Sequence, residues 1–349
     1  MSKVSTLWPE VNFPFTLAPM VGLTHAALRE VIRDYLPKNA KTFWPTEMLN
    51  SRRLPHQNVG ETPETKIGPR EDFLVPQILG NEKKFINLSI QKLTKLNIKG
   101  IDINMGCPVR KALRHNYGVA LMGDPNYASQ IVAMAKQDNS LPVSVKIRAG
   151  LNNDNDYLFR FCDGLIAAGA NLISLHPRTA AQKRRGNANW DQITQLKKKM
   201  SIPLYGNGDV QTYKDALKML DETGCDGVMI GRALTVRPWM FWQLGEALGF
   251  DPPAGKEHLH APQTPEEEAK EYGKVIESFI DKCFHFFDQD YATRKFKFYL
   301  KVSSPWLNFG QSLIKKINKG QSKEHYSEIT QEFFHSSGLL LHPYTMLTY

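Results

Sequence analysis

The sequence predicts an α/β protein in which a (β/α)8 barrel is followed by an all-helical C-terminal domain. Short apolar, β-branched segments alternate with longer segments of helical periodicity eight times. All but the first of these segments have polar residues or glycine at or near their ends. The alternation stops after Leu248, and only helical patterns follow. A chain of 349 residues is long enough for one large domain with a smaller one attached.

The eight short segments are the predicted strands of the barrel. In chain order they are Phe15–Met20, Lys41–Met48, Phe73–Gly80, Gly100–Gly106, Pro142–Gly150, Asn171–Thr179, Pro203–Val210 and Gly227–Ala233. Strands that alternate with helices form parallel βαβ units, and eight units in about 230 residues favour a barrel over an open doubly wound sheet. The connections agree, since residues 82–97 and 189–200 place apolar side chains at intervals of three and four residues.

The C-terminal third has a different composition. Residues 249–272 are rich in proline, glycine and charge, and the helical pattern "EEEAKEYGKVIESFIDKCFHFF" begins within them. We therefore predict a barrel domain over residues 1–245, a linker over 246–262 and a helical domain over 263–349. Between Arg294 and Lys323 this domain has eight Lys and Arg residues but no Asp or Glu, with Tyr299 and Trp306 among them. Such a segment favours contact with a nucleic-acid backbone.

Composition limits the class of protein further. The net charge of +9 favours a polyanionic partner. The N-terminal sequence lacks the layout of a signal peptide, and the longest apolar stretch, Gly164–Leu175, is too short to cross a bilayer. We expect a cytoplasmic monomer without membrane association. The four cysteines are far apart and form no C-x-x-C pair, so we expect neither a metal site nor a disulfide framework.

Residues at the strand ends, most of them polar or glycine, predict a functional site at one end of the barrel. These residues are Pro19-Met20, Glu47, Gln77, Asn104, Lys146 to Arg148, His176 to Arg178, Asn207 to Asp209 and Gly231-Arg232. The carboxyl ends of barrel strands meet at a single mouth, where active sites are built. The glycines and the arginine after the last two strands suit a phosphate. A dinucleotide fingerprint is rejected, because Gln211 stands where its third glycine would be.

Seven motifs in chain order resemble those of the tRNA-dihydrouridine synthases. They are "APM", "QILG", "DINMGCP", "SVKIR", "HPRT", "GNGD" and "MIGRA...RPWMF". The resemblance covers Phe15–Phe241 strongly and Arg294–Lys301 more weakly, and it is closest to the bacterial B-type members. It implies an FMN enzyme with a barrel and a helical domain that reduces uridines in tRNA, with NADPH as electron donor.

The resemblance also implies roles for particular residues. It implies that Cys107 is the proton donor. It implies that FMN is held by Pro19, Met20, Val21, Gln77, Lys146, His176, Asn207, Gly208, Asp209, Gly231 and Arg232. The sequence departs from the family pattern in two places. Val21 and His25 stand where acidic residues are common. The turn Lys183-Arg184-Arg185 is more basic than usual, which leaves the mode of tRNA docking open.

The chemistry of uracil reduction accounts for a thiol directly after the fourth strand. Saturating the C5=C6 bond needs a hydride at C6, which reduced FMN can supply, and a proton at C5. A thiol with an ordinary pKa of about 8.5 is mostly protonated at neutral pH and can act as a general acid. Pro108 restricts the backbone of Cys107, which would aim the sulfur at the mouth.

The neighbouring polar residues have matching roles in this interpretation. Asn104 can offer a donor and an acceptor to a uracil edge. Lys146 would stabilise the anion of the reduced cofactor. Arg148 and Arg178 would then face the base or its phosphates, which makes them substrate-binding candidates with Asn104. Glu47 is interpreted as a salt-bridge residue beneath the site.

Two other functions remain open on the sequence alone. An FMN-dependent oxidoreductase of free pyrimidines, similar to dihydroorotate or dihydropyrimidine dehydrogenases, would need no basic helical domain. A non-catalytic RNA-binding barrel would need no thiol, lysine and histidine at one mouth. The tRNA position that is modified, the orientation of the tRNA and the choice between NADPH and NADH do not follow from the sequence.

Overall fold

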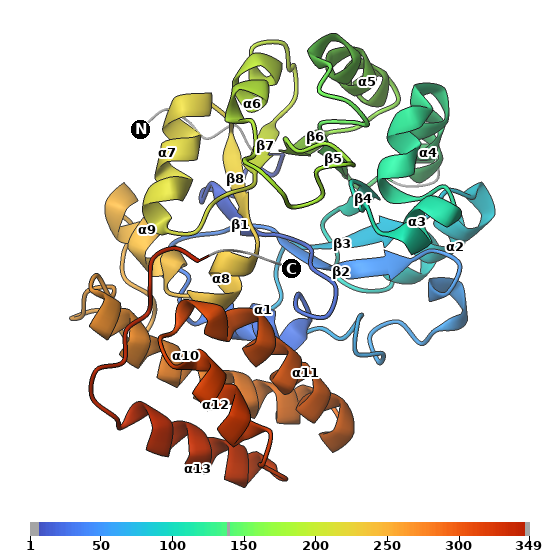
Figure 1. Cartoon of the computed structure of the whole chain (residues 1–349). Coiled ribbons are helices and arrows are strands. Elements are labelled where there is room, and N and C mark those ends of the chain that lie inside the picture. Colours follow the sequence, from blue (N-terminus) through green and yellow to red (C-terminus); the bar gives the residue numbers. More distant parts are fainter. Residues whose placement is uncertain (1–6, 138–139, 346–349) are drawn as a thin grey trace.

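The computed structural model describes residues 7–137 and 140–345, and its first domain is the predicted barrel (Figure 1). The eight parallel strands are β1 (Phe15–Leu17), β2 (Trp44–Asn50), β3 (Leu74–Leu79), β4 (Ile101–Met105), β5 (Val143–Arg148), β6 (Leu172–His176), β7 (Leu204–Asn207) and β8 (Gly227–Ile230). Their hydrogen-bonded order is β1-β8-β7-β6-β5-β4-β3-β2. The barrel prediction is confirmed.

Side chains join β1 and β2, the two ends of this ladder. Thr16 Oγ1 donates to the carbonyl of Phe43 at 2.5 Å, and Thr42 Oγ1 donates to the carbonyl of Phe15 at 2.7 Å. Both threonines are buried, and their hydroxyl groups join the two segments beside the backbone bonds from Asn12 and Phe13 to the carbonyl of Lys41.

Helices surround the strands. They are α1 (Ala26–Arg33), α2 (Lys83–Leu93), α3 (Arg110–Arg114), α4 (Pro125–Gln137), α5 (Asn155–Ala167), α6 (Trp190–Lys197), α7 (Tyr213–Thr223), α8 (Arg232–Val236) and α9 (Met240–Leu248), with 3-10 turns η1 (Leu54–His56) and η2 (Gly118–Gly123). Local sequence fixes their ends. In α7, Thr212 and Asp215 form a capping box, and Gly224 ends the helix in the left-handed conformation.

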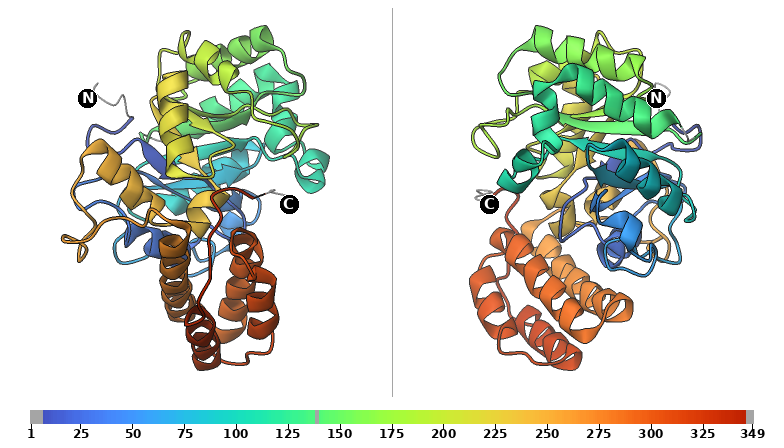
Figure 2. Two further views of the ribbon diagram at one scale, coloured as in Figure 1. Left: turned by 60° about the vertical axis from the view of Figure 1, so that its left-hand side comes forward. Right: turned by 90° about the vertical axis from the view of Figure 1, so that its right-hand side faces the viewer.

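The helical domain lies beside α1 at one side of the barrel (Figures 1 and 2). It contains α10 (Pro265–Phe286), α11 (Gln289–Ser303), η3 (Ser304–Trp306), α12 (Gly310–Ile317) and α13 (Lys323–Phe334). The capping box of Thr264 and Glu267 begins α10. The described helices include none that is long and apolar enough to span a membrane.

Buried polar contacts fix the helical domain to the barrel. Tyr35 Oη donates to Glu271 Oε1 at 2.7 Å, and Tyr299 Oη donates to the carbonyl of Thr235 at 2.9 Å. Arg237 forms an ion pair of 3.0 Å with Glu268. Each bond joins a barrel residue to α10 or α11, so the two domains share an ordered interface.

A return segment, residues 342–345, brings the chain back from the helical domain to the barrel (Figure 1). Arg237 donates to the carbonyl of His342, and Tyr344 Oη donates to Asp215 Oδ1 at 3.2 Å. The backbone amide of Thr345 donates to Gln211 Oε1 at 3.0 Å. The helical domain is therefore attached to the barrel both before α10 and after α13.

Candidate active site

The strand-end residues of β3, β4, β5 and β7 meet at the barrel mouth. Asn104 Nδ2 donates to Gln77 Oε1 at 2.8 Å, and Lys146 Nζ donates to Asn207 Oδ1 at 2.9 Å. Asn104 and Lys146 are partners in the parallel ladder, which places the two hydrogen-bonded pairs side by side. The strand ends thus place two hydrogen-bonded polar pairs next to each other at the mouth.

The thiol of Cys107 lies in the loop that follows β4, and Asn104 shapes this loop. Asn104 Oδ1 accepts hydrogen bonds from the backbone amides of Gly106 at 3.1 Å and Cys107 at 2.9 Å. On the other side, the amide of Val119 donates to the Cys107 carbonyl at 3.1 Å. The half-buried Cys107 is therefore held through its backbone from two directions.

Gly118 allows η2 to pack against Cys107. Its φ is +59°, and an added Cβ would lie 2.6 Å from the Cys107 carbonyl oxygen and 2.9 Å from the Cys107 Cβ. Only glycine combines this backbone conformation with such a close approach. No local pattern near Gly118 reveals that its neighbour is Cys107, so Gly118 was not predictable as a site residue.

Asp102 is a second site residue that was not predicted from the sequence. It is buried, and it accepts hydrogen bonds of 2.6 Å from both Ser144 Oγ and Gln77 Nε2. A chain of bonds therefore runs from Asp102 through Gln77 and Asn104 to the Cys107 amide. The alternation in "IDIN" was the available signal, because it places Asp102 on the same strand face as Asn104.

Burial sets the protonation of the mouth. It raises the pKa of the Cys107 thiol, although Arg148 and Lys146 oppose this effect. Burial, with help from Arg148, lowers the pKa of Lys146 to about 8. Burial and the surrounding cations hold the pKa of His176 well below 6.5. At neutral pH the mouth therefore combines a protonated thiol, an ammonium group and a neutral imidazole.

The two arginines predicted to contact substrate bind loops in this structure. Arg148 donates from Nε to the carbonyl of Gly106 and from Nη1 to the carbonyl of Lys183, both at 2.8 Å. Arg178 forms an ion pair of 2.5 Å with Asp209 and donates to the carbonyl of Gly186 at 2.6 Å. Both side chains are buried, so a direct contact of either with substrate stays a prediction.

The loops after β7 and β8 offer a surface that fits a phosphate. Asp209 is neutralised by Arg178 and by the amide of Ala188, which donates at 2.6 Å, so it would not repel an anion. A Cβ on Gly208 would lie 3.0 Å from the His176 ring, whereas the nearest atom to a Cβ on Gly231 would be 3.5 Å away. The backbone at Gly231 is therefore open to close approach.

The loop after β1 completes the predicted cofactor residues. The amide of Met20 donates to Thr24 Oγ1 at 2.9 Å, and Val21 is 59% exposed. Met20 lies close to Gly231. Its Sδ is the nearest atom to a Cβ added at that glycine, at 3.5 Å. Pro19, Met20 and Gly231-Arg232 therefore lie on one side of the mouth.

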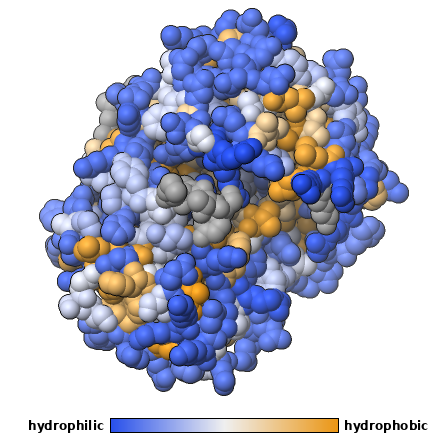
Figure 3. Space-filling view, in the orientation of Figure 1, coloured by the Kyte–Doolittle hydropathy of each residue, from blue (hydrophilic) through white to orange (hydrophobic). Residues whose placement is uncertain are grey.

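Exposed apolar side chains occur on the loops and the short helix that follow the strands at the rim. They are Val21 after β1, Val109 and Leu113 after β4, and Leu151 after β5. Figure 3 shows a hydrophobic patch on this face in the region of α3, surrounded by hydrophilic residues. Apolar surface of this kind at the entrance to a site can pack against flat ring systems.

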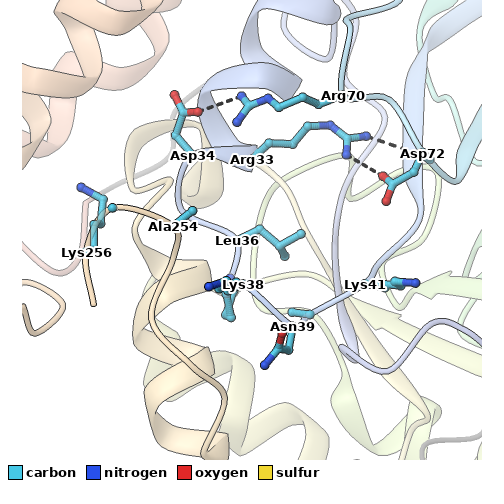
Figure 4. Close-up of a pocket in the computed structure, with 13 residues that line it drawn as sticks. Arg33, Asp34, Leu36, Lys38, Asn39, Lys41, Arg70, Asp72, Ala254 and Lys256 are labelled. Atoms are coloured by element: carbon cyan, nitrogen blue, oxygen red, sulfur yellow. Dashed lines mark hydrogen bonds and ion pairs between the residues drawn. The ribbon is translucent and has the colours of Figure 1, made fainter. Parts of the chain in front are cut away.

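A wide pocket elsewhere is not part of this mouth (Figure 4). It has a volume of about 670 Å³ and lies between residues 33–41, which lead into β2, and residues 254–256. Ion pairs border it, with Arg33 and Asp72 at 2.7 Å and Arg70 and Asp34 at 2.8 Å. Because it lies at the amino-terminal side of the strands, we regard it as a structural crevice.

The fold and mouth define a class: barrel proteins with a thiol, a lysine and a histidine at the carboxyl ends of the strands. The family model described as dihydrouridine synthase matches residues 16–328. The chain therefore belongs to the dihydrouridine synthase family.

Curated relatives agree with this family, and one solved structure shares the fold. A probable tRNA-dihydrouridine synthase of Mycobacterium tuberculosis is 34% identical over 70% of this chain and 64% of its own. The tRNA-dihydrouridine synthase B of Pseudomonas aeruginosa is 31% identical over 72% of this chain and 73% of its own. The chain spans 63% of the Synechocystis relative, probable tRNA-dihydrouridine synthase 1, at 32% identity over 65% of this chain. Histamine dehydrogenase from Rhizobium sp. 4-9 shares the fold at TM-score 0.53 and 10% identity, over 78% of this chain and 49% of that one.

Proposed function

We propose that the protein reduces the C5=C6 bond of uridines in tRNA to 5,6-dihydrouridine, with FMN as cofactor and NADPH as electron donor. Family membership supports the reaction. The main support for the proposal is geometric, because Asn104 holds the Cys107 loop at a mouth that Lys146 and His176 also border. Burial raises the pKa of the thiol, which favours its protonated form at neutral pH. Such a set suits proton donation beside an electron-rich cofactor.

The residues present fit FMN. The open backbone at Gly231, the cationic Arg232 and the neutralised Asp209 suit its phosphate, and Pro19, Met20 and Val21 border the same side. Gln77, Lys146, His176, Asn207 and Gly208 would hold the remainder. When bound, FMN supplies the hydride for the C6 atom of uracil.

The protein contributes the proton and the positioning. Cys107 gives its thiol proton to C5, and the resulting thiolate is stabilised by the cations of Lys146 and Arg148. Lys146, anchored by Asn207, offsets negative charge in the mouth. Asn104 is occupied by Gln77 and by the Cys107 loop, so its first role is to orient the thiol. Its contact with uracil stays a prediction.

The choice of substrate is tested with purified protein. We expect yellow protein that releases FMN on denaturation and, with NADPH, forms dihydrouridine in unmodified tRNA but not in free uridine or uracil. Reduction of free uracil at a similar rate would support a free-pyrimidine oxidoreductase instead. Absence of flavin would support a non-catalytic RNA-binding barrel. The domain boundaries at 245 and 262, the cytoplasmic location and the monomeric state also stay predictions.

The helical domain is the proposed tRNA-docking surface, but several cations of its basic segment, Arg294 to Lys323, form ion pairs within the protein. The basic segment is partly neutralised, because Lys295 pairs with Glu47, Lys316 with Glu332 and Lys323 with Asp281. The exposed cations of the segment are Arg294, Lys301, Lys315 and Lys319. Arg294 and Lys301 belong to α11, the helix that also contacts the β1 loop through Phe298.

Neutralising this surface should change the salt dependence of tRNA binding. Replacing Arg294 and Lys301 by Gln should reduce the slope of log affinity against log salt by about 0.7–0.9 for each phosphate that the variant no longer binds. The matched control replaces Lys95 and Lys198, two exposed lysines after helices at the opposite end of the barrel. Equal slopes in both variants would move the docking surface to the turn at Lys183-Arg184-Arg185.

A further inference from the structure

One buried carboxylate joins the helical domain to the β1 loop. Glu47, on β2, accepts a hydrogen bond from the backbone amide of Gly22 at Oε2, with a distance of 2.5 Å. Its other oxygen, Oε1, accepts from Lys295 Nζ of α11 at 3.1 Å. The two oxygens thus bind two elements that are far apart in the sequence.

The surroundings make this contact a tight one. Lys295 is 12% exposed in its side chain and lies 5.1 Å above the Tyr291 ring. A Cβ added to Gly22 would lie 2.8 Å from Phe298 Cε1, so the loop backbone also touches an aromatic ring of α11. Tyr291, Lys295 and Phe298 follow each other at helical spacing, which places all three on one face of α11.

Burial makes the pair sensitive to loss of either member. The Glu47 side chain is 4% exposed, so an unpaired carboxylate here would lack solvation by water. Exposed ion pairs contribute little, whereas breaking a buried pair by removing one partner is strongly destabilising. Loss of Lys295 would therefore leave Glu47 to move toward water and release Gly22.

We propose that Glu47 is a positioning residue through which Lys295 of the helical domain fixes the cofactor loop, Pro19 to Gly22. The inference rests on the proposed function, because it takes this loop as part of the flavin site. Its consequence is that α11 influences flavin affinity although it lies outside the mouth. Coupling between two sites is reciprocal, so flavin in the mouth also influences how α11 receives RNA.

The test compares FMN affinity in full-length variants. After removal of the flavin, FMN is titrated by fluorescence quenching in the absence of tRNA. Lys295→Met should weaken FMN binding by about tenfold, within the usual range of coupling between sites. Lys295→Arg should restore most of the affinity, because it keeps the charge. The control, Lys297→Met, removes a cation that instead lies 5.6 Å over the Tyr326 ring of the same domain.

A second measurement separates the positioning role of the Glu47–Lys295 pair from a purely structural one. Cleavage of residues 249–262 by a protease reports how firmly the helical domain is docked. Unchanged FMN affinity in Lys295→Met, with faster cleavage, would overturn the inference and leave the proposed function intact. Parent protein that binds no FMN would contradict the proposed function itself. If Lys295→Met does not fold, Glu47→Gln with Lys295→Met removes both charges, and parental FMN affinity in that double variant would also overturn the inference.

Discussion

Replacing Cys107 by alanine is expected to slow the reduction of tRNA by about 10²-fold or more, the usual contribution of general acid catalysis. Burial raises the pKa of this thiol, so the parent protein holds its proton at neutral pH and the variant has no group to replace it. FMN content and flavin reduction by NADPH should be unchanged, because no predicted cofactor contact is removed. Stopped-flow absorbance of the flavin separates its reduction by NADPH from its reoxidation by tRNA.

Another cysteine provides the control. Cys162 is buried within α5, away from the strand ends, and Cys162→Ala should leave both half-reactions near the parental rates. A parental rate of tRNA reduction in Cys107→Ala would make Cys107 a structural residue. Slow flavin reduction by NADPH in the same variant would instead place the thiol in cofactor binding.

Replacing Gly118 by alanine should reproduce the same defect through geometry. The new Cβ would lie 2.6 Å from the Cys107 carbonyl oxygen, so the Cys107 loop must move. A displacement of about 1 Å can cost about 10²-fold in rate, and we expect tRNA reduction to slow by about 10- to 100-fold. The positive φ adds a stability cost of about 1–2 kcal/mol.

The chain offers a matched control for the backbone cost. Gly224 has φ +65°, and a Cβ there would meet no atom within 4 Å. Gly224→Ala therefore carries the conformational cost without the clash. In denaturant unfolding, both variants should lose the stability that an alanine at positive φ costs. Only Gly118→Ala should slow the reduction of tRNA. Equal and near-parental rates would mean that the position of Cys107 tolerates the shift.

The barrel was predictable because its signal is local. Eight apolar segments with polar ends need only short-range periodicity to be recognised, and all eight became strands. Their lengths were overestimated where the backbone leaves the β region. The segment Pro203–Val210 forms a strand only over Leu204–Asn207, because Gly208 and Asp209 have φ values of +119° and +58°.

The site was predictable only in part, because its contacts join distant residues. Strand ends bring Gln77, Asn104 and Lys146 to one mouth by topology alone. The salt bridge expected for Glu47 is present, but its partner Lys295 is separated from it by 248 positions, and no local pattern predicts that pairing. For the same reason, the binding of Arg148 to the loops that carry Gly106 and Lys183 could not be foreseen.

The return segment has a mechanical consequence for the helical domain. A body joined to another at one point can swing in any direction, whereas a body held at two separated points can turn only about the line between them. The chain enters α10 at Thr264 and rejoins the barrel through Tyr344 and Thr345, which gives the domain two anchor points. The buried bonds of α10 and α11 to the barrel add further points of attachment, so the domain is held in one orientation.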